Sequence, residues 1–564
     1  MDTLVGENYL FDNTLNKSGS DADTYLVKQK NLTGYIDQQR GQGDYTSGKV
    51  IIDAQSGNTT DVNDWSNAYI TLPYLYKLSV NCTTGAASSI GAYDPNYLLA
   101  PKNCSLIESM RVEQGGRVVI EDCSNLSHLV SFRKHQTTSA TSLGNDTGDI
   151  YYPDGEFSES ITASIAGVRN VSNCPITVST NAPNTFYNNG ALMRQRQMIG
   201  NNRITTFVSA ASSTNEQAPY QAATVQTALT AATETTLSEV HYLAIIKLSD
   251  LSDYFATHPL AKGGYKFTFS INSGISIMTT TADAATSGVA WLAKPLTLTA
   301  TSLIGSATVQ PCMATIGGTN CVNSTSVVAQ TTNTVYRFTL TSKVDTTSDA
   351  RQSGVQLWIP SLTLSDKDEA KLLSQPIIHR TPFMINSSVY QNQGAGAPIN
   401  LQLFNAISNP RAVIIIPQYS SAVGSQTQPS QCSPLNPCPG VTDPLSIQRI
   451  QLRLNTKPIL PAPINYGWNA FVQNTSQLFT ANGGLDSNGA INTGMINLSR
   501  FMNNYRYYAF DVSLTSADQR DIPQMITLEG LSGSSVSMDL YVFVLYEQDV
   551  TFNIQNATVQ VGTA

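Results

Sequence analysis

Residues Val355–Asn386, VQLWIPSLTLSDKDEAKLLSQPIIHRTPFMIN, decide the fold. Ser365 stands at the N-cap of a short helix, because Asp368 follows three residues later as in a capping box. Pro376 ends this helix, and residues 377–385 have strand character again. The stretch therefore predicts a short strap between two β-rich halves. Before the helix, apolar residues recur with the period of a half-buried strand, at Val355, Leu357, Ile359, Leu362 and Leu364.

Short apolar strands are predicted on both sides of the strap. The Gly115-Gly116 pair suits a tight hairpin, and Ser249 suits the cap of a helix whose Leu251 and Phe255 point inward. Each half has about eight such strands, small helices and long polar loops, which is typical of a jelly-roll sandwich. The strand candidates lie at 49–54, 68–80, 106–112, 117–120, 161–168, 203–208, 241–248, 265–271, 296–300, 335–340, 411–418, 447–454, 505–514, 525–528 and 538–552, with helices near 124–135 and 465–479.

The predicted fold class is all-β, with two consecutive eight-stranded jelly-roll sandwiches, short helices and long loop insertions. We expect an N-terminal arm over residues 1–44, a first jelly roll over 45–365 and a second over 366–564. The first should carry insertions at about 136–235 and 275–350, where Thr, Ser and Ala dominate.

The composition favours a protein whose surface is covered by neighbouring molecules. The chain has 564 residues, enough for two large domains, but only 13% are charged and the net charge is −8. Little like-charge repulsion opposes association of such a surface, and an acidic balance argues against direct nucleic-acid binding. The first forty residues carry six acidic and four basic side chains, unlike a secretory signal or a basic arm. The apolar runs are too short to predict a transmembrane segment.

Six blocks of sequence, scattered in order over nearly the whole chain, resemble the double jelly-roll major capsid proteins of polinton-like viruses, virophages and large eukaryotic DNA viruses. They are GKVIIDA (48–54), WSNAYITLPYLYKLSV (65–80), LAIIKLSDLSDYFATHPLAKGGYKFTF (243–269), LWIPSLTLSDKDEAKLLSQP (357–376), NNYRYYAFDVSL (503–514) and MDLYVFVLYE (538–547). The resemblance implies a non-enzymatic protein without a cofactor, whose homotrimers form pseudo-hexagonal capsomers. These would tile an icosahedral shell around a DNA genome, assembled inside the host cell together with penton and minor capsid proteins. On this analogy the long insertions form tower loops on the capsid exterior.

Motifs that could carry chemistry are weak. Gly43–Lys49 fits GxxxxGK, but Val50 replaces the Ser or Thr that would ligate magnesium, and a strand follows where a phosphate-binding helix should begin. Five histidines never approach a zinc-ligand spacing, so no metal site is predicted. Residues Asp366, Asp368 and Glu369 are explained by the first turn of a helix.

Tyrosines and cysteines leave two further possibilities open. Alternation places Tyr508 and Phe510 opposite Tyr505 and Tyr507, which favours a core and an interface over a stacking platform. Two cysteine pairs lie close enough to close small loops as candidate disulfides, or stay thiols in a reducing compartment. They are Cys312 with Cys321 and Cys432 with Cys438.

Two other functional classes compete with the shell protein. A non-viral adhesin or carbohydrate-binding sandwich would explain the Thr- and Ser-rich loops and the tyrosines. A β-sandwich glycosidase would require two carboxylates across one cleft, at about 5–9 Å.

Overall fold

The computed structural model describes most of the predicted strands. The described residues are 27–37, 48–55, 61–84, 92–93, 98–99, 106–115, 118–137, 204–207, 223–224, 235–282, 297–304, 313–314, 334–345, 354–374, 377–419, 446–479, 495–503, 505–513, 522–534, 537–554 and 558–562.

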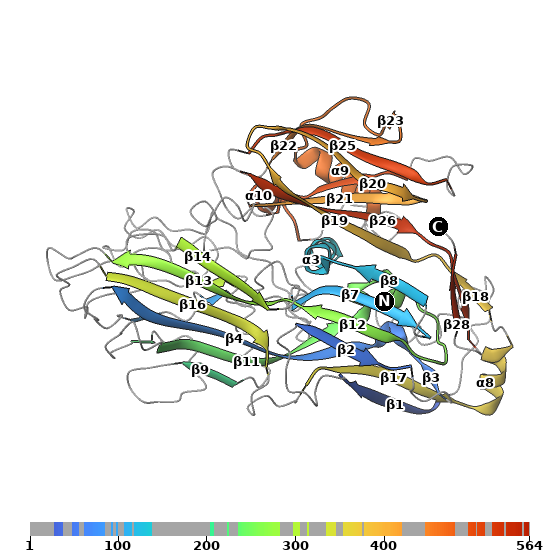
Figure 1. Ribbon diagram of the computed structural model, residues 1–564. Helices are drawn as coiled ribbons and strands as arrows, with labels where there is room; N and C mark the ends of the chain where they lie inside the picture. The colour runs from blue at the N-terminus through green and yellow to red at the C-terminus, as the bar shows by residue number, and fades with distance from the viewer. Residues whose placement is uncertain are drawn as a thin grey trace.

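The first half is a sandwich of two antiparallel sheets (Figure 1). One has the order β1-β17-β4-β11 and the other β2-β12-β7-β8. Numbered along the chain, these eight strands have the order 1-8-3-6 and 2-7-4-5, which is the jelly roll. Their bounds are β1 Val27–Ile36, β2 Lys49–Asp53, β4 Tyr69–Thr84, β7 Ile107–Gln114, β8 Val118–Cys123, β11 Thr235–Lys247, β12 Lys266–Ile271 and β17 Gln356–Leu364.

The second half repeats this topology. Its sheets have the order β19-β26-β21-β24 and β20-β25-β22-β23, which is again 1-8-3-6 and 2-7-4-5. The protein is therefore an all-β double jelly roll, and the predicted fold class is confirmed. The strands are β19 Phe383–Gln393, β20 Pro398–Ile407, β21 Pro410–Tyr419, β22 Ile447–Leu454, β23 Lys457–Pro458, β24 Tyr508–Asp511, β25 Gln524–Ser532 and β26 Met538–Glu547.

Side chains alternate across the first sheet in register. Tyr35, Leu357, Ile70 and Ile246 lie opposite one another on neighbouring strands and face the core. The neighbouring row of residues points to the outer face of the sheet. At the two ends of this row, Ile36 on β1 and Ile245 on β11 are 46% and 39% exposed. One face of the sheet is thus packed while the other keeps apolar side chains near solvent.

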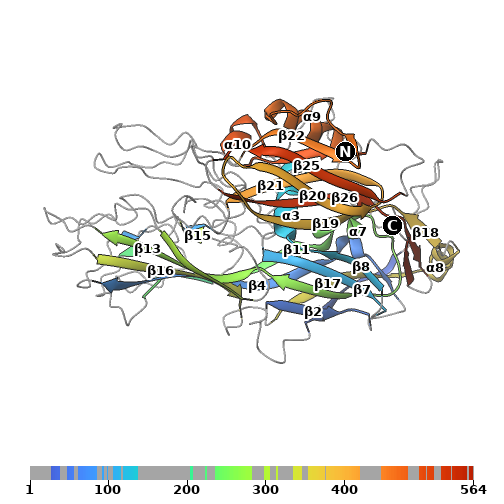
Figure 2. The same ribbon diagram turned by 45° about the horizontal axis from the view of Figure 1, so that its top comes forward.

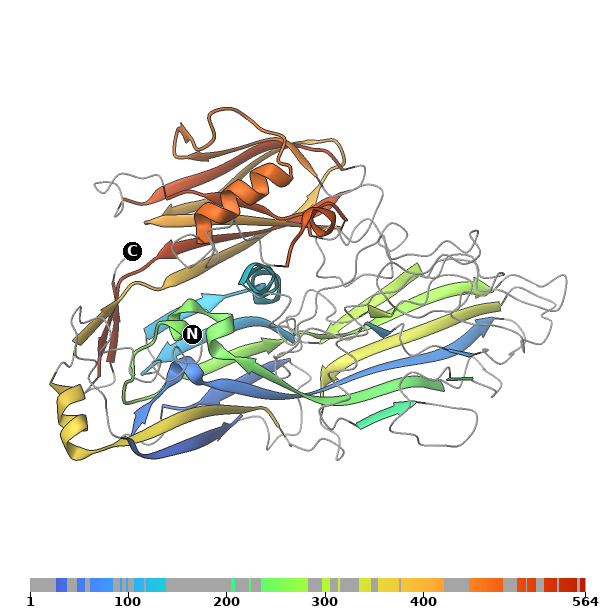
Figure 3. The ribbon, with the colours of Figure 1, turned by 180° about the vertical axis from the view of Figure 1, so that it is seen from behind.

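The first sandwich extends into a long projecting sheet. The start of β4 pairs with β17, whereas its later residues pair with β16 (Thr334–Val344), which in turn pairs with β13 (Ser273–Ala282). With β14 (Thr297–Ile304) and β9 (Ile204–Phe207), these strands reach beyond both sandwiches (Figure 1 and Figure 3). Strands predicted near 296–300 and 335–340 are confirmed. Much of the insertions expected at 136–235 and 275–350 lies outside the described residues.

The strap is helix α8 (Asp366–Leu373), and it leads into a small sheet of β18 (Ile377–Arg380), β27 (Val550–Asn553) and β28 (Thr558–Val561) at the C-terminal end (Figure 2). Strand β28 is one of the two edge strands of this sheet. The Gln114 side chain of the first sandwich covers that edge, because its Oε1 accepts a hydrogen bond from Val559 N at 2.7 Å.

Two local predictions are wrong. Residues Val27–Ile36, expected within an irregular arm over 1–44, form β1, because they pair along β17 and bury Tyr35 against the core. Ser249 is not a cap: the helix predicted there is two short ones, α6 (Leu248–Leu251) and α7 (Asp253–Ala256), and Ser252 between them caps the second. The inward Leu251 and Phe255 are confirmed as fully buried. The division at residues 365 and 366 stays a prediction.

The remaining elements lie between these strands in the sequence. They are β3 Val62–Asn63, the 3₁₀ turn η3 Trp65–Asn67, β5 Ala92–Tyr93, β6 Leu98–Leu99, α3 Leu126–Thr137, β10 Ala223–Thr224, β15 Met313–Ala314, α9 Trp468–Phe479 and α10 Leu498–Asn503.

Candidate functional site: the joint between the two sandwiches

Helix α3 lies between the two sandwiches (Figure 1 and Figure 3). A helix on a protein surface normally keeps one polar face in water. In α3 both the apolar and most of the polar side chains are buried, because one sandwich covers each side. The buried set is Leu126, Ser127, His128, Leu129, Val130, Ser131, Phe132, His135 and Gln136.

Aromatic side chains of α3 contact the second sandwich directly. His128 stacks on Tyr541 of β26, with 4.1 Å between ring centroids. Phe132 meets Tyr507 edge-on at 4.9 Å, and the Nδ1 atom of His135 lies 3.1 Å from the Tyr507 hydroxyl. Because these are buried polar and aromatic contacts with defined geometry, they fix the angle between the halves as well as their proximity.

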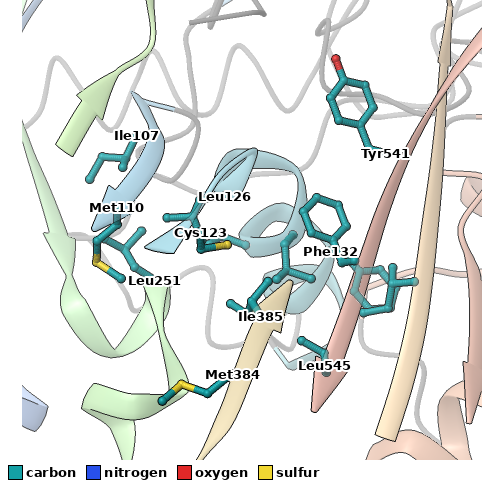
Figure 4. Close-up of a cluster of buried hydrophobic side chains, with 14 of the residues drawn as sticks. Ile107, Met110, Cys123, Leu126, Phe132, Leu251, Met384, Ile385, Tyr541 and Leu545 are labelled. Atoms are coloured by element: carbon teal, nitrogen blue, oxygen red, sulfur yellow. The ribbon is translucent and has the colours of Figure 1, made fainter. Parts of the chain in front are cut away.

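One apolar core passes through the joint. Ile107, Met110 and Cys123 of the first sandwich pack toward α3, and Met384 and Ile385 of β19 pack from the other side (Figure 4). All belong to one continuous cluster of buried side chains. A shared core of this kind holds the two jelly rolls together, unlike the polar interfaces that let domains move independently.

A second contact joins α7 to the C-terminal strands. The backbone N–H of Phe383 donates to Asp253 Oδ2 at 3.0 Å, which ties the start of β19 to α7. The Phe552 ring of β27 lies 5.5 Å from Tyr254 and 4.8 Å from His258, centroid to centroid.

His258 belongs to a buried relay of hydrogen bonds. Its Nδ1 lies 2.6 Å from the Pro259 carbonyl oxygen and must donate to it, so its Nε2 accepts from the Tyr265 hydroxyl at 2.5 Å. Tyr254 completes the relay through its hydroxyl, 2.9 Å from that of Tyr265. Burial lowers the pKa of His258 to about 3, partly opposed by its bond to Pro259, so the relay holds a neutral imidazole.

The strap is fixed to the first sandwich by its charged first turn. Ser365 Oγ accepts from Asp368 N at 3.2 Å, which confirms the predicted cap. Lys262 pairs with Glu369 at 2.6 Å, and Lys28 of β1 pairs with Asp366 at 2.7 Å. The acidic side chains therefore cap and anchor a helix, as the sequence indicated.

Pro360 marks a change of surroundings along β17. Before it, Val355, Leu357 and Ile359 belong to the main core. Beyond it, Leu362 and Leu364 enter a separate small cluster beneath the strap, together with Val62, Leu260, Leu372 and Ile554. Side chains of β17 therefore belong to two separate hydrophobic clusters.

The predicted tyrosine set divides into two pairs with different neighbours. Tyr508 and Phe510 contact Tyr466 inside the second sandwich, at 5.1 Å each. Tyr505 and Tyr507 precede β24, so strand alternation does not place them, and they contact His135 of α3 at 4.2 and 6.1 Å. The first pair therefore lies within the second sandwich and the second pair at the joint.

Several other residues singled out in the sequence lie outside the described part of the chain. The candidate disulfide residues Cys312, Cys321, Cys432 and Cys438 lie outside the described residues. Residues 43–47 of the GxxxxGK motif also lie outside them, while Lys49 begins the strand β2, as predicted. Within the described part of the chain, no group of three or more His, Cys, Asp or Glu side chains could hold a metal ion. Nor does any described helix combine the length and apolar character needed to cross a membrane.

Sequence reasoning missed the buried polar residues of the joint, above all Glu121, Ser252 and His258. The sequence indicated only one of them. Ser252-Asp253 stands directly before the apolar pair Tyr254-Phe255, which is a pattern typical of a helix N-cap, but Ser249 was the alternative N-cap residue.

Comparisons with known proteins are as follows. No family model matches the chain, and no curated protein matches it. Among solved structures, the Sputnik virophage structure determined by cryo-electron microscopy matches with a TM-score of 0.47 and 12% identity over 97% of this chain and 92% of the other. The mavirus major capsid protein gives 0.43 and 8% over 97% and 92%. The Faustovirus major capsid protein gives 0.43 and 6% over 98% of both chains.

Proposed function

We propose that this protein is a major capsid protein, a structural subunit that catalyses nothing. Three copies would form a pseudo-hexagonal capsomer, and capsomers would tile an icosahedral shell around a DNA genome. The virion capsid would be its location, with assembly inside the host cell. Penton and minor capsid proteins would be its partners besides itself.

The observation that carries this proposal is the repetition of one strand order in two halves that share a core. Three chains of this kind present roughly six similar upright units, which can approximate sixfold packing while the true symmetry is threefold. A rigid joint is required for this role, because tiling fails if the angle between the two units varies. Fold alone does not establish function, so the proposal depends on assembly.

The surface of the first sandwich supports burial against other copies. Leu32, Ile36 and Ile245 lie on the outer face of the first sheet and are 49%, 46% and 39% exposed. Exposed apolar side chains gathered on one sheet face are typical of an interaction surface. A stable interface between copies should bury at least about 1,200–2,000 Å².

Light scattering after size exclusion, followed by negative-stain microscopy, tests the proposal. Trimers with a hexagonal outline support it, whereas monomers that bind glycans would support the adhesin instead. The double variant Ile36→Asp/Ile245→Asp should give folded monomers. Ile377→Asp is the matched control, because Ile377 is 55% exposed on β18 of the small sheet, away from that face.

A further inference from the structure

Glu121 is a buried carboxyl at the joint. It lies near the end of β8, the edge strand beside the second sandwich, and is only 4% exposed. Its neighbour Asp122 points to solvent and pairs with Arg111 at 3.5 Å. Burying a carboxylate is costly, so a carboxyl at this position needs a specific explanation.

A short chain of contacts connects Glu121 to the second sandwich. The Ser252 hydroxyl donates to Glu121 Oε2 and accepts from Tyr254 N at 3.2 Å, which caps α7. The next residue, Asp253, holds the backbone N–H of Phe383 at 3.0 Å. Glu121 therefore supports the small helix that grips the first strand of the second jelly roll.

Charged and titratable groups approach Glu121 from every side of the joint. Arg133 comes from α3, while Asp253 comes from α7 with the same sign of charge as an ionised Glu121. Tyr254, Tyr546 of β26 and Cys123 on its own strand also interact with its charge. Ionised Glu121 would repel Asp253, the residue that holds Phe383.

We propose that Glu121 is a pH-sensitive latch: a neutral carboxyl buried beside α7 favours the closed joint, and its ionisation, which places a buried negative charge beside Asp253, weakens the joint between the sandwiches. The latch is built within one chain, so it goes beyond the capsid role and does not depend on it. In a shell, it would give each subunit a defined response to a change from acidic to neutral surroundings.

The direction of the response follows from the burial. Burial, assisted by Asp253 and opposed by Ser252 and Arg133, raises the pKa of Glu121 from 4.5 to about 7. Because the pKa is higher in the closed joint than in an opened one, protonation favours closure. The stabilisation is complete below pH 4.5, declines as the pH rises toward 7, and is lost above that.

Hydrogen–deuterium exchange of the full chain tests the latch, with Glu121→Gln compared to the unaltered protein at about pH 5 and about pH 8. Exchange in α7 and β19 is divided by exchange in β22, a strand of the far sheet, to remove the intrinsic effect of pH. His258 titrates in the opposite direction, but it is present in both chains and cancels. Protection of the unaltered chain relative to Glu121→Gln should fall by up to roughly 70-fold between these pH values. Asp122→Asn, which removes the exposed neighbouring carboxyl, should behave like the unaltered chain.

An unchanged ratio between the two chains would overturn the latch. If Glu121→Gln does not fold, infrared difference spectra of the unaltered chain replace it: a protonated-carboxyl band must be present at about pH 5 and gone at about pH 8, and its absence throughout would equally overturn the proposal. Light scattering on the same samples separates the two questions, because failure to form trimers counts against the capsid role and leaves the exchange measurement valid.

Discussion

Truncating Phe132 to Ala should destabilise both sandwiches at once. The ring is fully buried in α3, between the apolar side chains of both halves, and meets Tyr507 edge-on at 4.9 Å. An aromatic side chain removes about 150–250 Å² from water, worth roughly 4–6 kcal/mol at about 25 cal/mol per Å². Measured Phe→Ala losses of about 3–5 kcal/mol indicate that relaxation recovers part of this. We expect the free energy of unfolding to fall by about 4 kcal/mol.

Urea unfolding followed by far-UV circular dichroism, with calorimetry alongside, measures this change. The unaltered chain should unfold in one transition, since its core is continuous. Leu498→Ala is the matched control, because Leu498 is 53% exposed on α10 and its truncation should cost less than about 0.5 kcal/mol. A Phe132→Ala chain as stable as the control would refute the rigid joint, as would a loss confined to one of two separate transitions.

Three further changes test other parts of the structure. Val542→Asp should abolish folding, because Val542 is fully buried in the centre of a sheet; native-sized particles in size exclusion would contradict this. Gly264→Ala would place a Cβ 1.9 Å from the Ala54 carbonyl oxygen, so we expect a loss of roughly 2–4 kcal/mol in urea titrations, and an unchanged midpoint would show that the backbone adjusts freely. Burial lowers the pKa of His258 from 6.5 to about 3, so its contribution to stability is present above pH 6.5 and declines toward pH 3. Relative to His258→Gln, the unaltered chain should therefore lose roughly 2–3 kcal/mol between about pH 6.5 and about pH 4.5, and a constant difference would argue against the neutral relay.

Strand periodicity and capping chemistry predicted the fold because they are local. The alternation over 355–364 and the Ser365 cap each depend on neighbours within a few residues, and both are present in the structure. Strand alternation explains only Tyr508 and Phe510 of the tyrosine block, because Tyr505 and Tyr507 precede β24.

The joint could not be predicted because it depends on contacts between residues that are far apart in the sequence. Helix α3 carries serines and histidines that suit a solvent-facing side, yet the second sandwich, some 400 residues away along the chain as judged from the His128–Tyr541 contact, covers them. Strand β1 was missed for a related reason. Lys28, Gln29, Lys30 and Asn31 are polar and exposed, so the pairing with β17, more than their own character, makes them a strand.

The contact of the Gln114 side chain with β28 affects how readily such a chain aggregates at high concentration. An open strand edge is a template onto which a second polypeptide can add, and many identical chains crowded together would extend such additions into fibres. Gln114 accepts a hydrogen bond from the backbone N–H of Val559. It reaches that edge only when the two jelly rolls are docked. Correct docking therefore covers part of an edge that a half-folded chain would leave open, so some protection against aggregation at β28 comes with the native arrangement itself.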